Sequence, residues 1–130
     1  MQQDILMTYL AVACGGALGA MSRYWVYNAF VKASESKFPF ATLTVNIVGS
    51  FLIGIAFVLI TERTEIGPEW RGLITVGFLG AFTTFSTFSM DTIGLLEQGQ
   101  IASAITYVLS SVLVCIIAAW LGLTFSRVFF

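Results

Sequence analysis

The chain has 130 residues, of which 58% are hydrophobic and 10% are charged, and its formal net charge is −1. A soluble domain usually carries about a quarter of its residues as Asp, Glu, Lys or Arg, so this composition excludes an ordinary water-soluble protein. The nearly neutral charge offers no basic surface for nucleic acid. The chain has no histidine, which removes the commonest general base and metal ligand.

Four apolar runs divide the sequence, at 5–30, 42–60, 73–96 and 101–125. Each is close to the ~20 residues that a helix needs to cross the hydrocarbon core of a bilayer. Because the backbone in lipid must satisfy its own hydrogen bonds, these runs are expected to be helices rather than strands. We therefore predict an all-α membrane protein in which residues 1–130 form a single domain of four transmembrane helices.

Small residues four positions apart recur in three of the runs, and such spacing lets two helix backbones approach closely. The pairs are Gly15 and Gly19, Gly16 and Ala20, Ser50 and Gly54, and Ala118 and Gly122. Cys14 and Cys115 both lie in apolar stretches and are expected to be free thiols that pack as small hydrophobic side chains. No disulfide framework or zinc site is expected.

The basic residues give a balanced topology signal. Lys and Arg near helix ends normally collect on the cytoplasmic side of a membrane. Arg63, Arg71 and Arg127 are expected on the side of the termini, and Arg23, Lys32 and Lys37 on the opposite side. Three against three predicts insertion in both orientations and an antiparallel homodimer with closed two-fold symmetry. The alternative is that a single charge tips every copy into one orientation.

The third run carries an unusual stretch, residues 77–89, which reads Gly-Phe-Leu-Gly-Ala-Phe-Thr-Thr-Phe-Ser-Thr-Phe-Ser. Serine and threonine hydroxyls in a helix often bond back to a carbonyl one turn earlier, which would be a purely structural role. Hydroxyls this dense beside glycines instead favour a helix that breaks in the middle of the membrane. Exposed carbonyls are tolerated there only where they are buried in protein or line a cavity, and they can coordinate a small cation.

Other polar residues in the apolar runs are few. Asn46 lies early in the second run, Asp91 late in the third, and Tyr107 and Ser111 lie one turn apart on the fourth. Arg23 lies toward the end of the first run, so no Lys or Arg is expected in the middle of a helix. Polar groups inside membranes are costly and often functional, or they form hydrogen bonds between helices. Both readings remain open for each residue.

These motifs together resemble the small dual-topology fluoride channels, the Fluc family. The first run contributes Gly-Gly-Ala-Leu-Gly-Ala-Met-Ser-Arg-Tyr at 15–24, and the second contributes Thr-Leu-Thr-Val-Asn-Ile-Val-Gly at 42–49. The stretch at 77–89 is the most specific part, and the pair Tyr107 and Ser111 supports it. The resemblance covers nearly the whole chain.

The resemblance implies an antiparallel homodimer in the bilayer of a bacterial cytoplasmic membrane, with two separate fluoride pores, no organic cofactor and passive export that confers fluoride resistance. A structural Na⁺ on the two-fold axis would be held by the carbonyls of Gly80 and Thr83 from each subunit. Asp91 stands where the family usually has glutamate, one methylene longer, so its role is undetermined. The residues implied for the pore are Asn46, Phe85, Ser86, Thr87, Phe88, Tyr107 and Ser111, with Arg23 in an electropositive vestibule.

The chemistry of these residue types suits fluoride, which is small and strongly hydrated. Asn amides and Ser, Thr and Tyr hydroxyls supply dense hydrogen-bond donors, and phenyl rings present a positive edge to an anion. Conduction also requires sites weak enough to release the ion.

Three other functions remain as alternatives. A small proton-coupled exporter of cationic compounds needs an acidic residue within the membrane, and Asp91 is the only carboxylate inside an apolar run. A structural subunit of a larger complex would leave the hydroxyl and phenyl stretch unexplained. An enzyme would need an acid–base pair in a polar cleft, and the sequence shows neither.

Overall fold

The structure is a computed structural model that describes residues 2–130. Within them, four segments are long and apolar enough to cross a membrane, and no strand is present. The predicted all-α architecture with four candidate spans is confirmed. The elements are α1 (Gln2–Ala33), α2 (Phe40–Phe57), η1 (Val58–Arg63), α3 (Pro68–Arg71), η2 (Gly72–Leu79), α4 (Gly80–Phe82), α5 (Phe85–Glu97) and α6 (Ile101–Phe129), where η1 and η2 are π-helical.

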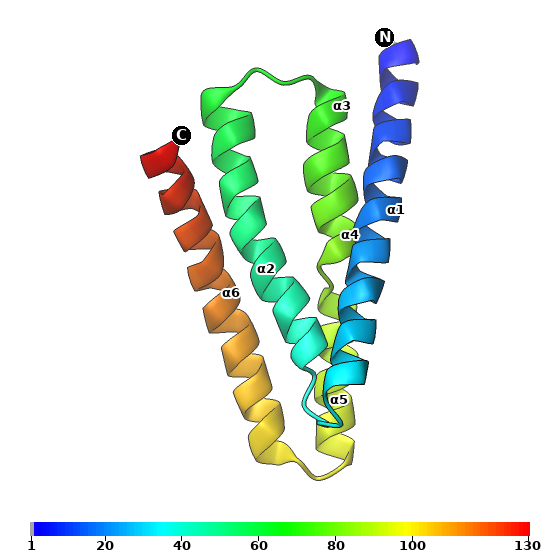
Figure 1. Ribbon diagram of the computed structural model, residues 1–130, viewed down its shortest axis with the longest axis vertical. Helices are drawn as coiled ribbons and strands as arrows, with labels where there is room; N and C mark the ends of the chain where they lie inside the picture. Colours follow the sequence, from blue (N-terminus) through cyan, green and yellow to red (C-terminus); the bar gives the residue numbers. More distant parts are fainter. Residues whose placement is uncertain (1) are drawn as a thin grey trace.

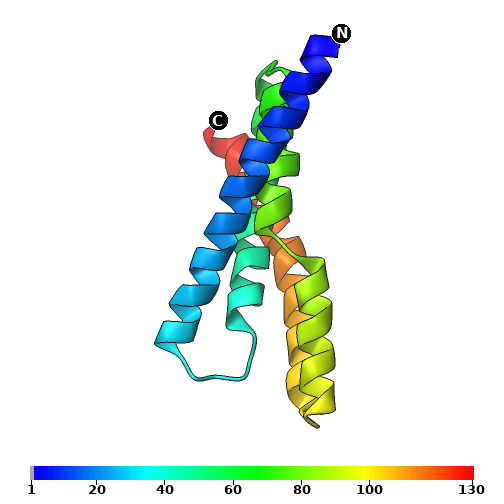
Figure 2. The ribbon, with the colours of Figure 1, turned by 90° about the vertical axis from the view of Figure 1, so that its right-hand side faces the viewer.

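The four spans run up and down (Figure 1), with both termini and the connection at 64–67 at one end and the other two connections at the opposite end. The third span, from α3 to α5, changes partner along its length. Its first half, including η2 and α4, packs on α1, whereas α5 packs on α6. Figure 2 shows the consequence: α5 and the start of α6 diverge from the lower part of α1. The second span packs along α6.

Helix α5 ends in a tight turn that leads directly into α6. Gly99 adopts φ +72°, a left-handed conformation that glycine takes without steric cost. Its amide donates to the Leu96 carbonyl at 2.9 Å, and the amide of Gln100 donates to the Leu95 carbonyl at 2.9 Å. This pair of bonds satisfies the last carbonyls of the helix, so α6 can start at once alongside α5.

The outer surface of the chain is strongly apolar. Within its most apolar window, the first span has 11% of its residues buried by the rest of the chain, against 33% for the second span. The second span is therefore the central one, and the first presents most of its side chains outward. Trp25 and Trp120, for example, are largely exposed. Such a surface requires lipid or another protein chain to cover it.

The first span meets the third at its predicted small residues. A methyl group on Gly19 would overlap the backbone carbonyl of Phe78, and one on Gly15 would overlap that of Leu73. The neighbouring Gly16 has nothing within 4 Å of the same point. Only one face of this glycine-rich stretch therefore contacts the rest of the chain.

We expect Gly19→Ala to lower the free energy of unfolding by about 1–3 kcal/mol, because the extra methyl pushes α1 away from the third span. The matched control Gly16→Ala meets no atom of its own chain and should gain up to about 1 kcal/mol from helix propensity. Thermal unfolding of the purified protein in detergent measures both. Equal behaviour of the two variants would contradict the packing described here.

Candidate functional site

The third span is interrupted at two adjacent threonines. Thr83 has φ −83° and ψ 160°, and Thr84 has φ −154° and ψ 119°, so both are extended between α4 and α5. The Thr83 hydroxyl donates to the Leu79 carbonyl at 2.9 Å and so provides a partner for a carbonyl at the end of the first half of the span. The Thr84 hydroxyl accepts a bond of 3.2 Å from the Thr87 amide and so caps the start of α5.

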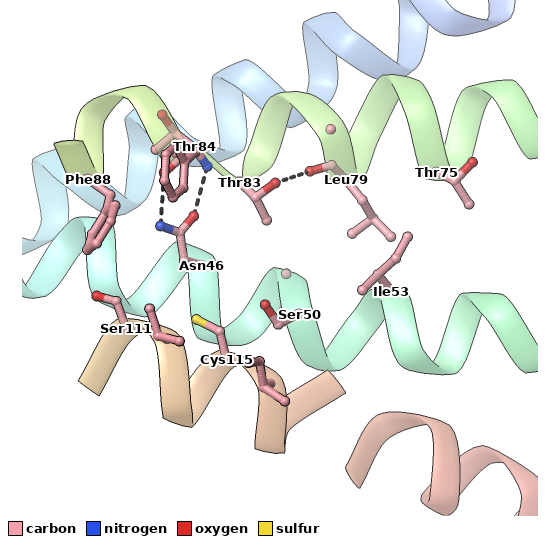
Figure 3. Close-up of a pocket in the computed structure, with 15 residues that line it drawn as sticks. Asn46, Ser50, Ile53, Thr75, Leu79, Thr83, Thr84, Phe88, Ser111 and Cys115 are labelled. Atoms are coloured by element: carbon pink, nitrogen blue, oxygen red, sulfur yellow. Dashed lines mark hydrogen bonds between the residues drawn. The ribbon is translucent and has the colours of Figure 1, made fainter. Parts of the chain in front are cut away.

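Asn46 on α2 bonds both backbone groups of Thr84. Its Nδ2 donates to the Thr84 carbonyl at 2.9 Å, and its Oδ1 accepts from the Thr84 amide at 2.8 Å (Figure 3). In an unbroken helix the Thr84 amide would donate to the carbonyl of Gly80. That carbonyl is therefore released from its usual partner.

The interruption brings two helix ends of opposite polarity together. The carbonyl groups at the end of α4 carry partial negative charge, and the free amides at the start of α5 carry partial positive charge. A cation is therefore favoured beside the carbonyls of Gly80 and Thr83. An anion is favoured beside the first turn of α5, which begins at Phe85.

A cavity of about 440 Å³ lies against this interruption, between the second span, the third span and α6. Asn46 and Ser50 face it from α2, and Ser111 and Cys115 face it from α6 (Figure 3). The hydroxyl of Ser111 has no hydrogen-bond partner, although the residue is only 7% exposed. Its donor is therefore free for a ligand in the cavity.

The structure brings some of the predicted site residues to this cavity and not others. Asn46, Phe85, Phe88 and Ser111 line it, as do Gly80 and Thr83. Ser86, Thr87 and Tyr107 do not. The Ser86 and Thr87 hydroxyls instead contact the Thr84 hydroxyl, at 3.3 and 3.0 Å.

The two predicted phenylalanines lie side by side, with ring centroids 5.3 Å apart and planes at 47°. Phe88 is 8% exposed and Phe85 is 78% exposed. One ring therefore belongs to the interior of the chain. The other projects from the mouth of the cavity, where another molecule would have to cover it.

Comparison with known proteins decides the family. A family model described as "CrcB-like protein, Camphor Resistance (CrcB)" matches residues 10–123. A protein of Saccharophagus degradans is 52% identical over 113 residues, which cover 87% of this chain and 84% of the relative. One of Geobacter metallireducens is 48% identical over 126 residues, covering 94% and 98%. Both relatives are named fluoride-specific ion channel FluC.

The chain belongs to the CrcB family. The resemblance drawn from the motifs is confirmed, and with four apolar spans the protein is a multi-pass membrane protein.

In this CrcB-family chain, Asp91 anchors a second polar cluster away from the interruption. Its Oδ2 accepts bonds from the Thr42 hydroxyl at 2.6 Å and from the Tyr107 hydroxyl at 3.1 Å. The Tyr27 hydroxyl lies 2.7 Å from that of Thr42. Because Thr42 gives its only hydroxyl proton to Asp91, Tyr27 must donate to Thr42. The cluster thus joins α1, α2, α5 and α6.

Tyr107 lies between the two parts of the site. Its ring is 5.2 Å from that of Phe88, which lines the first cavity. It is also 5.6 Å from the ring of Phe38, which lines a smaller recess of about 280 Å³. That recess is formed largely by the α1–α2 connection and includes Asp91 and Lys37. Tyr107 is fully buried and lines neither the recess nor the cavity, but its ring packs on one residue of each.

Arg23 lies close to the interruption. Its Nη1 donates to the Thr83 carbonyl at 3.4 Å, and α1 continues past it to Ala33. Arg23 thus lies in the second half of its helix, as the sequence predicted. Its contact with the Thr83 carbonyl was not expected.

Several residues of the site were missed in the sequence. Ser50 and Cys115 stand one helical turn after Asn46 and Ser111, and that spacing was the available signal. Thr84 could have been found as a threonine that precedes a helical stretch. The partnership of Tyr27 with Thr42 had no signal, since it joins two helices across a connection.

We expect Thr84→Val to lower the free energy of unfolding by about 1 kcal/mol, because α5 loses the hydroxyl that caps it. The control is Thr124→Val, whose hydroxyl bonds back to the Trp120 carbonyl within α6 at 2.9 Å. That variant should unfold close to wild type in the same thermal measurement in detergent. A Thr84→Val protein as stable as the control would contradict the capping role.

Proposed function

We propose that this protein is a passive fluoride channel that exports fluoride from the cytoplasm and so confers fluoride resistance. The observation that carries the proposal is the interrupted third span with its cavity, in a chain whose CrcB-family relatives are named fluoride-specific ion channels. Family membership also argues against an enzyme, since those relatives are named as channels.

Fluoride would be bound by donors around the interruption. Asn46 has a second Nδ2 proton beyond the one that bonds Thr84, Ser111 has an unused hydroxyl, and α5 begins with free amides. The edges of Phe85 and Phe88 add partial positive charge without a formal one. Sites of this kind attract a dehydrated anion and still release it, which is what conduction requires.

The working unit in this proposal is an antiparallel homodimer with two pores, inserted in both orientations in a bacterial inner membrane. The exposed ring of Phe85 and the open cavity beside it support a second subunit at this face. The interruption would then lie within the bilayer, where its free carbonyls need a protein or ion partner. Closed two-fold symmetry is the commonest form of homodimer.

A structural Na⁺ on the two-fold axis fits the groups available. Within residues 2–130, no three His, Cys, Asp or Glu side chains gather where they could hold a metal ion. Backbone carbonyls are the remaining ligands, and that of Gly80 has lost its helical donor to Asn46. The Thr83 carbonyl is shared with Arg23. Such an ion would add positive potential beside each pore.

The remaining predicted residues would act along the path of the ion. Arg23, close to the interruption, would attract fluoride into the vestibule. The hydroxyls of Ser86 and Thr87, joined to Thr84, and those of Tyr107 and Ser111 would continue the polar route. For a cell that is negative inside, efflux of one anion is favoured by about 2.3 kcal/mol per 100 mV. Passive conduction is therefore enough for export.

The test is ion efflux from liposomes that hold the purified protein, followed with fluoride and chloride electrodes while a potassium ionophore carries the counter-current. Rapid fluoride efflux without chloride efflux is the expected result. If neither ion moves although the protein is shown to be folded and dimeric, the proposal fails. Cationic compounds would then be tested as substrates.

Phe85→Ile and Phe88→Ile should each lower fluoride flux about tenfold, the effect of weakening one ion site by about 1.4 kcal/mol. Isoleucine keeps the apolar character but lacks the positive ring edge. Size-exclusion chromatography should show the same oligomer as wild type, because neither ring bonds the backbone at the interruption. Normal flux in both variants would remove the two rings from the pore.

Asp91→Asn separates a passive channel from a proton-coupled exporter. Asparagine keeps an oxygen that can accept from Thr42 and Tyr107 but cannot carry a proton through a transport cycle. A channel should keep a voltage-driven fluoride current that is within about tenfold of wild type, since a weakened hydrogen-bond acceptor costs about 1 kcal/mol. Complete loss of transport in a folded variant would favour the exporter.

A further inference from the structure

The contact between Asn46 and Thr84 has a feature that ion binding alone does not explain. Both hydrogen bonds go to the backbone of one residue, at 2.9 and 2.8 Å, and that residue is in extended conformation. A side-chain amide has the same donor and acceptor pair as a peptide group. Asn46 therefore replaces the bond that the Thr84 amide loses when the helix is interrupted, and it adds a donor to the Thr84 carbonyl.

This replacement matters because Thr84 is only 7% exposed. Buried backbone amides and carbonyls without a partner are strongly disfavoured, most of all in an apolar environment. Without Asn46, the Thr84 amide would lose its partner in the extended conformation, and the interruption would open to water more often. The start of α5 would then no longer be held in place.

The same contact limits what Asn46 can offer an ion. Its Oδ1 already accepts a hydrogen bond from the Thr84 amide. One Nδ2 proton is bonded to the Thr84 carbonyl. A single N–H remains, and its direction is fixed by the other two bonds.

We infer that Asn46 is a positioning residue that holds the Thr84 peptide group in extended conformation and thereby fixes the capped start of α5 beside the cavity. Thr84 is the link, since its backbone bonds Asn46 while its hydroxyl accepts from the Thr87 amide. In the proposed fluoride channel, the position of the start of α5 would also affect the fluoride-to-chloride ratio, and this part of the inference rests on the proposed function. The effect of Asn46 on the backbone does not.

The first experiment uses the wild-type protein. The chain has two asparagines, Asn28 and Asn46, so labelling asparagine with ¹⁵N gives two side-chain amide signals in an NMR spectrum. The inference requires that the two protons of the Asn46 amide exchange with water at clearly different rates, one slowed by the Thr84 carbonyl. Asn28 on α1 is the internal reference. Two equal, fast rates at Asn46 overturn the inference.

The second experiment measures hydrogen–deuterium exchange at the Thr84 amide, in protein without fluoride, by mass spectrometry with single-residue fragmentation. Asn46→Ala should speed exchange of Thr84 about tenfold, which corresponds to about 1.4 kcal/mol. Ser50→Ala is the matched control: it lies one turn away on the same helix and lines the same cavity but bonds no group of the interruption. Its Thr84 exchange should match wild type.

An Asn46→Ala protein with unchanged Thr84 exchange overturns the inference and leaves Asn46 as a direct ion ligand only. If that variant does not fold, Asn46→Ser, which retains a small polar group but cannot reach both backbone atoms, must show the faster exchange instead. The fluoride-to-chloride ratio from reversal potentials should fall in whichever variant shows faster exchange, and an unchanged ratio overturns the link to selectivity. If the wild-type protein conducts no fluoride, the channel proposal is wrong. The exchange rates of the Asn46 side-chain amide and of the Thr84 backbone amide would still decide the role of Asn46.

Discussion

The hydrogen bonds of one backbone segment, Thr83 and Thr84, are the constraint on which the site depends. A membrane helix normally satisfies its own amides and carbonyls, and an interruption exposes several of them in apolar surroundings. Here the backbone groups of Thr83 and Thr84 bond side chains from other helices. Asn46 of α2 bonds the Thr84 peptide, Arg23 of α1 bonds the Thr83 carbonyl, and the Thr84 hydroxyl caps α5. The interruption is therefore held by three elements at once, and none of them can shift without releasing a buried polar group.

That interruption also shapes the packing. An uninterrupted third span would follow one neighbour along its full length, but here η2 and α4 pack on α1 while α5 packs on α6. The change of partner leaves a cavity where the two halves meet, and it points a helix C-terminus and a helix N-terminus at the same region. A cation and an anion can thus be favoured a short distance apart without any charged side chain in the cavity lining. Backbone dipoles supply the field, which explains why glycine, threonine and phenylalanine fill a stretch where charged residues would be expected in a binding site.

Hydropathy and spacing were enough to predict the four helices, because the length of an apolar run is set by the bilayer and not by tertiary detail. The motif at 77–89 singled out the segment in which Thr83 and Thr84 are extended. The partners of the polar groups could not be predicted. Thr83 and Thr84 are adjacent residues of the same type, yet their hydroxyls have different roles. That of Thr83 donates to a carbonyl of the preceding helical segment, and that of Thr84 caps the start of the next helix. The partners of Asp91 could not be predicted either, because Thr42 and Tyr107 lie on other helices. The bond from Arg23 to the Thr83 carbonyl could not be predicted either, because it joins two helices.

Two side chains with formal charges lie inside the apolar spans, Arg23, which would retain a small anion, and Asp91, which would repel it, but each is already engaged. The carboxylate of Asp91 receives two hydroxyl protons and lies behind the buried ring of Tyr107, away from the cavity. The guanidinium of Arg23 donates to the Thr83 carbonyl, and Arg23 is not among the residues that line the cavity. An ion beside Phe88 and Ser111 would therefore meet dipoles and ring edges first, and full charges only at a distance. In the proposed channel, weak, closely spaced interactions of this kind would allow an ion to leave as readily as it enters, and the geometry of the interruption, rather than the number of charges, would set conduction.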